Sequence, residues 1–301
     1  MKGNSKTLFK QVEQEEQLYE RIQKKEEKDR QIMQTWIDKN KARASMATRV
    51  QSRVKSLARK DEMAALIDEK ESVFNFQYKP FKGKLTLLSL EKVDFAYPKC
   101  QKLLKMFSVA IANGEKVGII GKNGAGKSTL IKLMAGINKP QKGKVIYNEK
   151  CRFGYFGQTN IEVLDGGKSI YDTLASFLPT GNQKEVHALA ALVCFGEDEL
   201  EKKVKVLSGG EKARISFAKL MCESVNMLLC DEPTNHLDMY TAESLIEALK
   251  SFQGAVVVVS HDEGLLLEVC EKLVVFDQGQ IKIYNKTYDQ FLKEVGWAHE
   301  K

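Results

Sequence analysis

The chain lacks the features that would assign it to a membrane or secreted class. No apolar run approaches the roughly 18 residues that a membrane-spanning helix needs, and the longest, AVVVVS at 255–260, has the length of a strand. The first residues contain no apolar core, so they do not predict a signal peptide. The six cysteines stand far apart without a CxxC pair, which disfavours metal binding by cysteine and predicts reduced thiols in a cytoplasmic protein.

Proline and glycine are nearly missing from the first quarter of the chain. Residues 1–75 contain one glycine and no proline among many Glu, Lys, Arg and Gln residues, a composition that favours long helices. Apolar residues recur there in two stripes at a spacing of roughly 3.5, with a break near 38–41. This pattern predicts two helices packed as an antiparallel coiled-coil hairpin, and a single continuous helix is the alternative.

Positive charge is concentrated in the same region. The net charge of the chain is +7, and residues 1–80 hold 18 basic against 13 acidic side chains. The stretch 39–60 contains eight Lys or Arg residues and no acidic residue. Such a local bias indicates a polyanionic partner, with a solvated helical face as the alternative.

From about residue 82 the pattern changes to strands that alternate with helices, which predicts an α/β fold with a parallel sheet. Within this region GKNGAGKS at 121–128 fits GxxxxGK[ST] and stands between a strand-like and a helix-like segment. Glycines let backbone N–H groups surround phosphate oxygens, and the following helix N-terminus favours negative charge. We expect Lys127 to contact β- and γ-phosphate oxygens and Ser128 to hold Mg²⁺. A glycine-rich turn without a ligand is the alternative. The predicted nucleotide-binding residues of this loop are Gly121, Lys122, Asn123, Gly124, Ala125, Gly126, Lys127, Ser128 and Thr129.

Two further segments fit nucleotide chemistry. NMLLCDE at 226–232 reads as an apolar strand that ends in two carboxylates, of which Asp231 suits Mg²⁺ and Glu232 suits activation of the attacking water. LSGGE at 207–211 opens a helix and would form a second anion site, unless it is only an N-cap and turn. Because one nucleotide hardly needs two such sites on one domain, we expect the second site to serve a nucleotide held by another domain.

The order GKNGAGKST, Gln158, LSGGE, CDEPTNHLD and SHD over about 82–295 resembles the ATP-binding-cassette ATPases. The resemblance implies a mixed, mainly parallel sheet with an antiparallel β subdomain and a helical subdomain at about 160–224. It also implies a sandwich dimer with ATP and Mg²⁺ as cofactors. In such a dimer the opposing cassette would contribute the LSGGE residues, which are Ser208, Gly209, Gly210 and Glu211.

The same resemblance assigns roles to further residues. Gln158 would sense the γ-phosphate and Mg²⁺, and His261 would contact the γ-phosphate, so both join Glu232 as catalytic candidates. Asp238 would belong to the loop that communicates across the dimer. Tyr97 would stack on adenine, with a buried strand aromatic as the alternative.

The first quarter of the chain decides which branch of the family is closest. A basic helical segment before a cassette resembles the interdomain linker of the ABC-F branch, and DEPTNHLD, with Asn235, is similar to that branch. The chain thus resembles a linker (1–80) followed by a second cassette (81–296), without a first cassette. The partner cassette would be a second copy or a separate chain. The alternatives are the ATPase subunit of a membrane transporter and a DNA-associated cassette ATPase.

The ABC-F resemblance implies ATP-driven positioning of the basic arm on ribosomal RNA or tRNA, with no DNA partner expected. The segment lacks an aromatic platform for single-stranded bases, so we expect recognition of RNA shape and phosphate. The RNA-contact candidates are Lys39, Lys41, Arg43, Arg49, Arg53 and Lys55.

Overall fold

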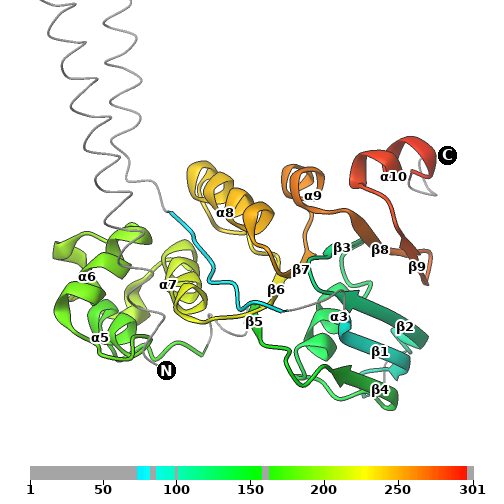
Figure 1. Cartoon of the computed structure of the whole chain (residues 1–301), viewed down its shortest axis with the longest axis horizontal. Coiled ribbons are helices and arrows are strands. Elements are labelled where there is room, and N and C mark those ends of the chain that lie inside the picture. Colours follow the sequence, from blue (N-terminus) through cyan, green and yellow to red (C-terminus); the bar gives the residue numbers. More distant parts are fainter. Residues whose placement is uncertain (1–72, 82–85, 99–100, 158–162, 297–301) are drawn as a thin grey trace, which may run out of the picture. The chain divides into compact units, whose positions relative to one another are not determined.

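The computed structural model describes residues 73–81, 86–98, 101–157 and 163–296 (Figure 1). The chain divides into two compact units, Met1–Glu71 and Ser72–Lys301. The predicted hairpin up to residue 72 and all six RNA-contact candidates lie outside the described residues, as does Gln158.

A six-stranded sheet forms the centre of the second unit. Its strand order is β5-β6-β7-β3-β8-β9, and all neighbours pair in parallel except β9, which runs antiparallel to β8. These strands are β3 (Lys116–Gly121), β5 (Phe153–Phe156), β6 (Met227–Asp231), β7 (Ala255–Val259), β8 (Lys272–Asp277) and β9 (Gln280–Tyr284). Strands β3, β6 and β7 are buried along their whole length, as their continuous apolar sequences require in a parallel sheet covered on both faces.

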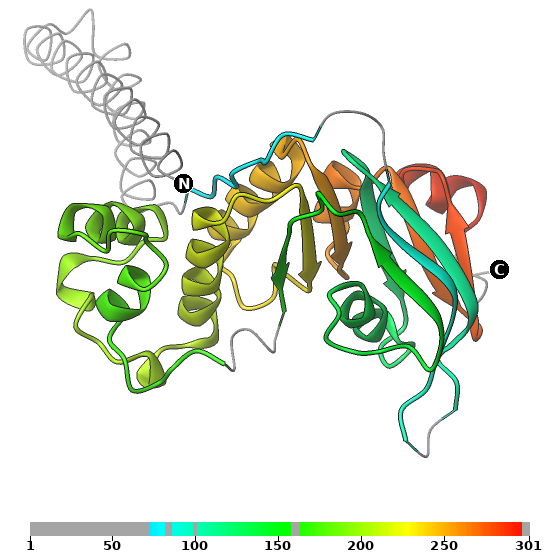
Figure 2. The same ribbon diagram turned by 60° about the horizontal axis from the view of Figure 1, so that its bottom comes forward.

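A second sheet is antiparallel, in the order β2-β1-β4, and consists of β1 (Thr86–Phe95), β2 (Leu104–Ala112) and β4 (Lys142–Tyr147). Helices α5 (Ile170–Ala175), α6 (Gln183–Leu192) and α7 (Gly209–Cys222) follow one another in the chain, with short 3₁₀ turns at Glu197–Glu199 and Val204–Val206. In both views these helices lie beside the β5 end of the central sheet, and the antiparallel strands lie away from them, on the side of β8 and β9 (Figure 1, Figure 2). The predicted α/β cassette fold with antiparallel and helical subdomains is confirmed.

The remaining helices cover the two faces of the central sheet. They are α3 (Lys127–Met134), α8 (Met239–Ser251), α9 (Glu263–Val269) and α10 (Tyr288–Glu294). Alternate residues of β7 enter different cores, so Val256 and Val258 pack with α7, α8 and α9, while Val257 and Val259 pack with α3 and the antiparallel sheet. Among the described residues, none of the helices is long and apolar enough to cross a membrane.

A buried lysine joins the central sheet to α8. Lys116, at the start of β3, is 9% exposed, and its Nζ donates hydrogen bonds to the carbonyl oxygens of Leu249 and Phe252 at the end of α8. These carbonyls have no partner within the helix, so the ammonium group caps its negative end. Lys116 thereby fixes α8 against the strand that leads into the glycine-rich loop.

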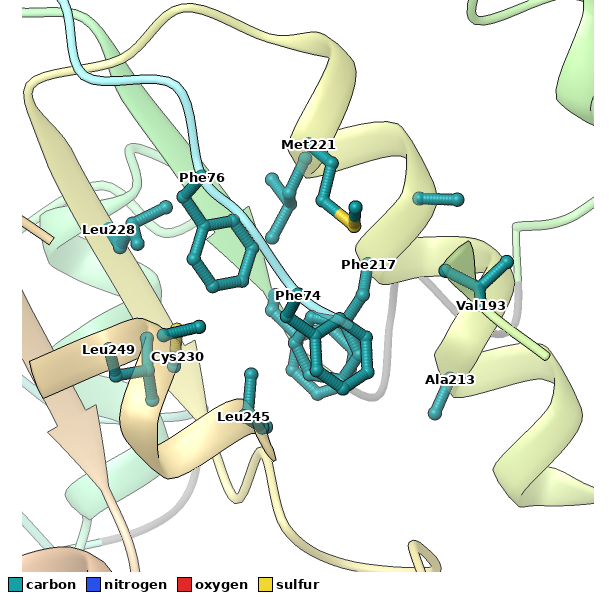
Figure 3. Close-up of a cluster of buried hydrophobic side chains, with 14 of the residues drawn as sticks. Phe74, Phe76, Val193, Ala213, Phe217, Met221, Leu228, Cys230, Leu245 and Leu249 are labelled. Carbon is teal, nitrogen blue, oxygen red and sulfur yellow. The ribbon is translucent and has the colours of Figure 1, made fainter. Parts of the chain in front are cut away.

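Residues 73–81 pack into the core of the second unit. Phe74 and Phe76 are buried beside α7, β6 and α8 (Figure 3), and Phe81 is buried in the core on the other face of the sheet. The compact unit begins at Ser72, earlier than the predicted boundary between residues 80 and 81. The segment packs here because burial of its apolar rings against the cassette removes them from water, which stabilises the fold.

Candidate nucleotide-binding and catalytic site

The loop between β3 and α3 has a backbone that only glycine adopts without strain. Gly124 and Gly126 have φ angles of 77° and 107°, and a Cβ on Gly121 would lie 2.5 Å from the carbonyl oxygen of Phe276. Gly126 is the N-cap of α3, where no side chain caps the helix and no acidic residue stands in the first turn. The N–H groups at this helix start therefore lack the side-chain acceptor that most helices have, which fits binding of an anion.

Lys127 lies within the curve of this loop. Its Nζ donates to the carbonyl oxygens of Gly121 and Lys122, at 2.8 and 3.2 Å, and lies 2.9 Å from Nε2 of His261. Burial lowers the pKa of Lys127, while the charges of Glu232 and Asp231 oppose that change. Two of these partners are uncharged carbonyl oxygens, so a phosphate oxygen in the loop would be a stronger acceptor for the ammonium group.

Ser128 and Asp231 form the second feature of the site. Ser128, in the first turn of α3, donates from Oγ to Oδ1 of Asp231, 3.0 Å away at the end of β6. Burial raises the pKa of the Asp231 carboxyl group, and the hydrogen bond from Ser128 opposes this rise. A hydroxyl and a carboxylate are ligands that suit Mg²⁺.

No cluster of three or more His, Cys, Asp or Glu residues in the described part of the chain could hold a metal by itself. Ser128 and Asp231 would therefore supply only part of the coordination of an ion. This fits Mg²⁺, which proteins commonly bind through one or two carboxylates together with phosphate oxygens and water.

Glu232 follows β6 and faces His261, which follows β7. The backbone N–H of Glu232 donates to the carbonyl oxygen of Val259, the last residue of β7, and its Oε1 lies 3.6 Å from Nε2 of His261. Glu232 has a φ of 51°, an uncommon conformation that is seen at functional positions. Burial raises the pKa of its carboxyl group, which His261 partly offsets. A carboxylate of this kind can accept a proton from water.

The LSGGE segment makes a complete helix cap within its own chain. The Ser208 side chain accepts from the backbone N–H of Glu211, and the Glu211 carboxylate accepts from both the N–H and Oγ of Ser208, at 2.7 and 2.6 Å. A Cβ on Gly210 would lie 2.5 Å from the carbonyl oxygen of His236, so this segment packs tightly on the loop after Glu232. Among the described residues, no hydrogen bond joins residues 208–211 to the 121–129 loop.

Tyr97 lies beyond the end of β1 and is 40% exposed, so it is not a buried strand aromatic. Its hydroxyl accepts from Oγ1 of Thr129 and Nδ2 of Asn138, at 3.4 and 3.3 Å, which holds the ring beside the start of α3. Sequence reasoning missed Asn138, because a lone Asn in the loop after a helix carries no motif. Asp238 caps α8 by accepting from the N–H of Thr241.

The structure thus brings together Lys127, Ser128, Asp231, Glu232 and His261 at the carboxyl ends of three neighbouring strands. In an open parallel sheet, ligands bind at this edge. Family models described as ABC transporter match the chain at residues 104–235 and 2–76.

Curated relatives match most of this chain. The mouse protein "ATP-binding cassette sub-family F member 3" is 34% identical over 291 residues, covering 96% of this chain and 41% of that protein. "Putative ATP-binding protein YdiF" of Bacillus subtilis is 35% identical over 263 residues, covering 87% of this chain and 41% of that protein. The chain therefore spans about two fifths of the length of these relatives.

Solved structures show the same fold. A dimeric post-hydrolysis state of the ATP-binding cassette MJ0796, bound to ADP and Pi, has a TM-score of 0.56 and 23% identity, covering 66% of this chain and 98% of that chain. A bacterial Atm1-family exporter with ATP bound has a TM-score of 0.61 and 22% identity, covering 85% and 48%. At these identities the likeness supports the architecture alone.

Proposed function

Because the chain belongs to the F branch of the ATP-binding-cassette family, we propose that it binds ATP with Mg²⁺ at the 121–129 loop and hydrolyses the terminal phosphate bond. The observation that carries this proposal is the convergence of strand ends on one loop. Lys127 contacts His261, Ser128 contacts Asp231, and Glu232 lies beside the same histidine.

Each of these residues has a separate role in hydrolysis. Lys127 places its ammonium group on β- and γ-phosphate oxygens, and His261 donates a hydrogen bond toward the γ-phosphate. Ser128 and Asp231 would hold Mg²⁺, which would supply positive charge to offset that of the phosphates. Glu232 orients the attacking water and accepts its proton as the water oxygen bonds to phosphorus and the bond to the bridging oxygen breaks.

A second cassette completes the site. We infer that residues 208–211 serve the nucleotide of a partner cassette, because no hydrogen bond joins them to the 121–129 loop among the described residues. The dimeric state named for the related cassette MJ0796 supports this arrangement. Either a second copy of this chain or a separate chain would supply the partner.

Closure of the two cassettes then positions the basic arm on ribosomal RNA or tRNA and so modulates translation in the cytoplasm. The basic stretch at 39–60 supports this part of the proposal, because eight cations without an acidic residue favour a polyanion. Membership of the F branch supports it too, since the alternatives, a transporter subunit and a DNA-associated ATPase, fit the basic segment less well.

Replacement of one glutamate tests the catalytic part. We expect Glu232→Gln to lower the kcat for ATP hydrolysis by at least about 100-fold, because the proton acceptor is lost, while the Kd for ATP changes little. Glu247→Gln, at an exposed position of α8, is the matched control and should keep the wild-type rate. An unchanged rate in Glu232→Gln would refute the role of Glu232.

Cosedimentation with ribosomes tests the arm, with the Glu232→Gln protein and Mg·ATP in all samples. We expect substitution of Arg43, Arg49, Arg53 and Lys55 by Gln to weaken binding and to reduce the slope of log K against log salt by about 3, since four phosphate contacts are lost. The matched control replaces four exposed lysines of the cassette, which are Lys105, Lys168, Lys184 and Lys282. Equal binding by the two quadruple variants would contradict the role of the arm.

A further inference from the structure

The segment that enters the cassette from the arm is held at several points along its length. We call residues 73–81 the strap. At its start, the N–H of Val73 donates to the carbonyl oxygen of Leu192, the last residue of α6, over 2.9 Å. Further along, the strap forms two backbone hydrogen bonds with Val225, which lies between α7 and β6. The N–H of Lys79 donates to the carbonyl oxygen of Val225, and the N–H of Val225 donates to the carbonyl oxygen of Gln77. The strap is therefore attached to the helical subdomain and to the approach to β6.

Aromatic rings connect the start of the strap to α7 (Figure 3). The ring of Phe74 lies 5.1 Å from that of Phe217 in an edge-to-face arrangement, and Phe76 lies 6.4 Å from the same ring. Phe217 is a fully buried residue of α7, the helix that begins with the LSGGE segment. Two residues of the strap therefore contact α7 directly.

Phe217 also contacts the strand next to the Asp231 strand. Its ring stacks on Phe156 at 4.0 Å and 8°, and Phe156 is the last residue of β5. Strand β5 pairs with β6 through Phe156 and Cys230, the residue before Asp231. Phe74, Phe217 and Phe156 hence form one row of rings from the strap to the central sheet. Such close-packed side chains move together and do not deform freely.

The end of the strap is fixed elsewhere. The hydroxyl of Tyr78 accepts from Nδ2 of Asn113, after β2, over 3.1 Å, and from the N–H of Phe81 over 3.1 Å. The Tyr78 ring packs edge-on against Phe252, after α8, with centroids 5.8 Å apart. Phe81 is buried with the antiparallel sheet. One end of the strap therefore contacts the helical subdomain, and the other contacts the nucleotide-binding part.

We propose that the strap couples the position of α7 to the chain that precedes residue 73, with Phe74 and Phe76 as positioning residues for α7. The strap is continuous with the arm, so any displacement of α7 relative to Tyr78 must shift Phe74 and the residues joined to it. The coupling rests on the proposed function, because ATP-driven closure supplies the displacement. By the same contacts, an arm held by its partner restrains the LSGGE segment.

Hydrogen exchange in the full chain tests the coupling. The protein carries Glu232→Gln, and exchange is followed by mass spectrometry with and without Mg·ATP. We expect ATP to change exchange in the 122–129 loop and also in the strap, where the N–H groups of Val73 and Lys79 are bonded across the subdomains. Phe74→Ala with Phe76→Ala should keep the change in the loop and lose most of the change in the strap. Val73→Ala, at a side chain that is 41% exposed, is the matched control and should keep both.

Hydrolysis in the otherwise wild-type chain gives a second readout. We expect Phe74→Ala to lower kcat about tenfold with KM within about twofold of wild type, because the loop still binds ATP while α7 is poorly placed. Phe74→Leu keeps an apolar side chain and should recover most of the rate. A role in stability alone predicts that Phe74→Ala lowers the melting temperature while the remaining folded protein keeps its kcat.

The outcomes separate the coupling from the proposed function. If ATP changes exchange in the loop but not in the strap, the coupling is overturned while ATP binding stands. If the double alanine variant keeps the change in the strap, the two rings are not the positioning residues and the proposal fails. If ATP changes exchange at neither place, ATP binding and the coupling are both refuted.

Discussion

Lys116 allows a test of the electrostatics that hold α8 in place. Its ammonium group is buried against the end of α8 and donates to two carbonyl oxygens there. Burial lowers its pKa from 10.5 to about 8, and the charge of Glu271 offsets part of this effect. We predict that the free energy of unfolding rises with pH in the wild-type protein relative to a Lys116→Met variant, whose side chain does not titrate.

The sign and size follow from the two pKa values. Between pH 8 and 10.5 the unfolded chain holds the Lys116 proton more firmly than the folded chain does, so stability increases as the pH rises through this window. The full difference corresponds to about 3 kcal/mol, of which about 2 kcal/mol is recovered between about pH 7 and about pH 9.5.

Buried thiols act in the opposite direction. Burial raises the pKa of Cys151 to about 11 and the pKa values of Cys222, Cys230 and Cys270 to about 12. Their thiols ionise more readily in the unfolded chain, which costs about 3 kcal/mol of stability by about pH 9.5. The loss at Cys151, Cys222 and Cys230 is common to the wild type and the variant, whereas the charge of Lys116 lowers the pKa of Cys270. The difference between the two proteins therefore reports on Lys116 together with its coupling to Cys270.

Urea unfolding of the nucleotide-free proteins, followed by circular dichroism at about pH 7 and about pH 9.5, gives this difference. We expect the wild type to gain about 2 kcal/mol relative to Lys116→Met between the two pH values. Lys282→Met, at an exposed position of β9, is the matched control and should run parallel to the wild type. Parallel profiles for Lys116→Met and the wild type would refute the assigned burial penalty.

Three further predictions concern the site and its support. Phe217→Ala should lower the free energy of unfolding by about 4 kcal/mol, because it leaves a cavity between three rings, and urea unfolding at an unchanged m-value checks this. Gly210→Ala should lower kcat about 100-fold without loss of ATP binding, because its methyl group would meet the carbonyl oxygen of His236, and steady-state kinetics with an ATP-binding assay measure both. Burial raises the pKa of Glu232, which must be ionised to accept a proton, so the rate of hydrolysis should begin to fall at a higher pH than an ordinary glutamate would cause. A profile of rate against pH measures where this decrease begins.

The residues of the candidate site could be found in the sequence because they stand directly after apolar strands. Parallel strands that are joined by helices place their carboxyl ends at one edge, so a glycine-rich loop after 116–121 and two carboxylates after 227–230 had to meet there. Motif and topology gave the same answer for Lys127 and Asp231. The distances could not be predicted, since they depend on the register of β6 and β7.

The strap is a part of the fold that the sequence does not predict. Its aromatic residues alternate at positions 74, 76 and 78, a period of two that is typical of extended chain. The alternation does not stand out in the sequence because the segment follows a long, charged helical pattern, and because a strap that makes one bridge to its neighbour lacks the turn signals of a strand. Its partners, Leu192 and Val225, lie more than a hundred residues away and carry no motif.

The two helix starts that suit an anion are electrically different. Helix α3 begins without a side-chain cap or an acidic residue, whereas α7 begins with Glu211 hydrogen-bonded to Ser208. That bond holds the pKa of Glu211 below its ordinary value, with help from Arg214 and Lys202, so its carboxylate is ionised and partly neutralised. A phosphate approaching α7 would meet this carboxylate, while one approaching α3 would meet Lys127. This difference supports the proposal that the 121–129 loop holds the nucleotide, while residues 208–211 contact one that is already held and neutralised by another cassette.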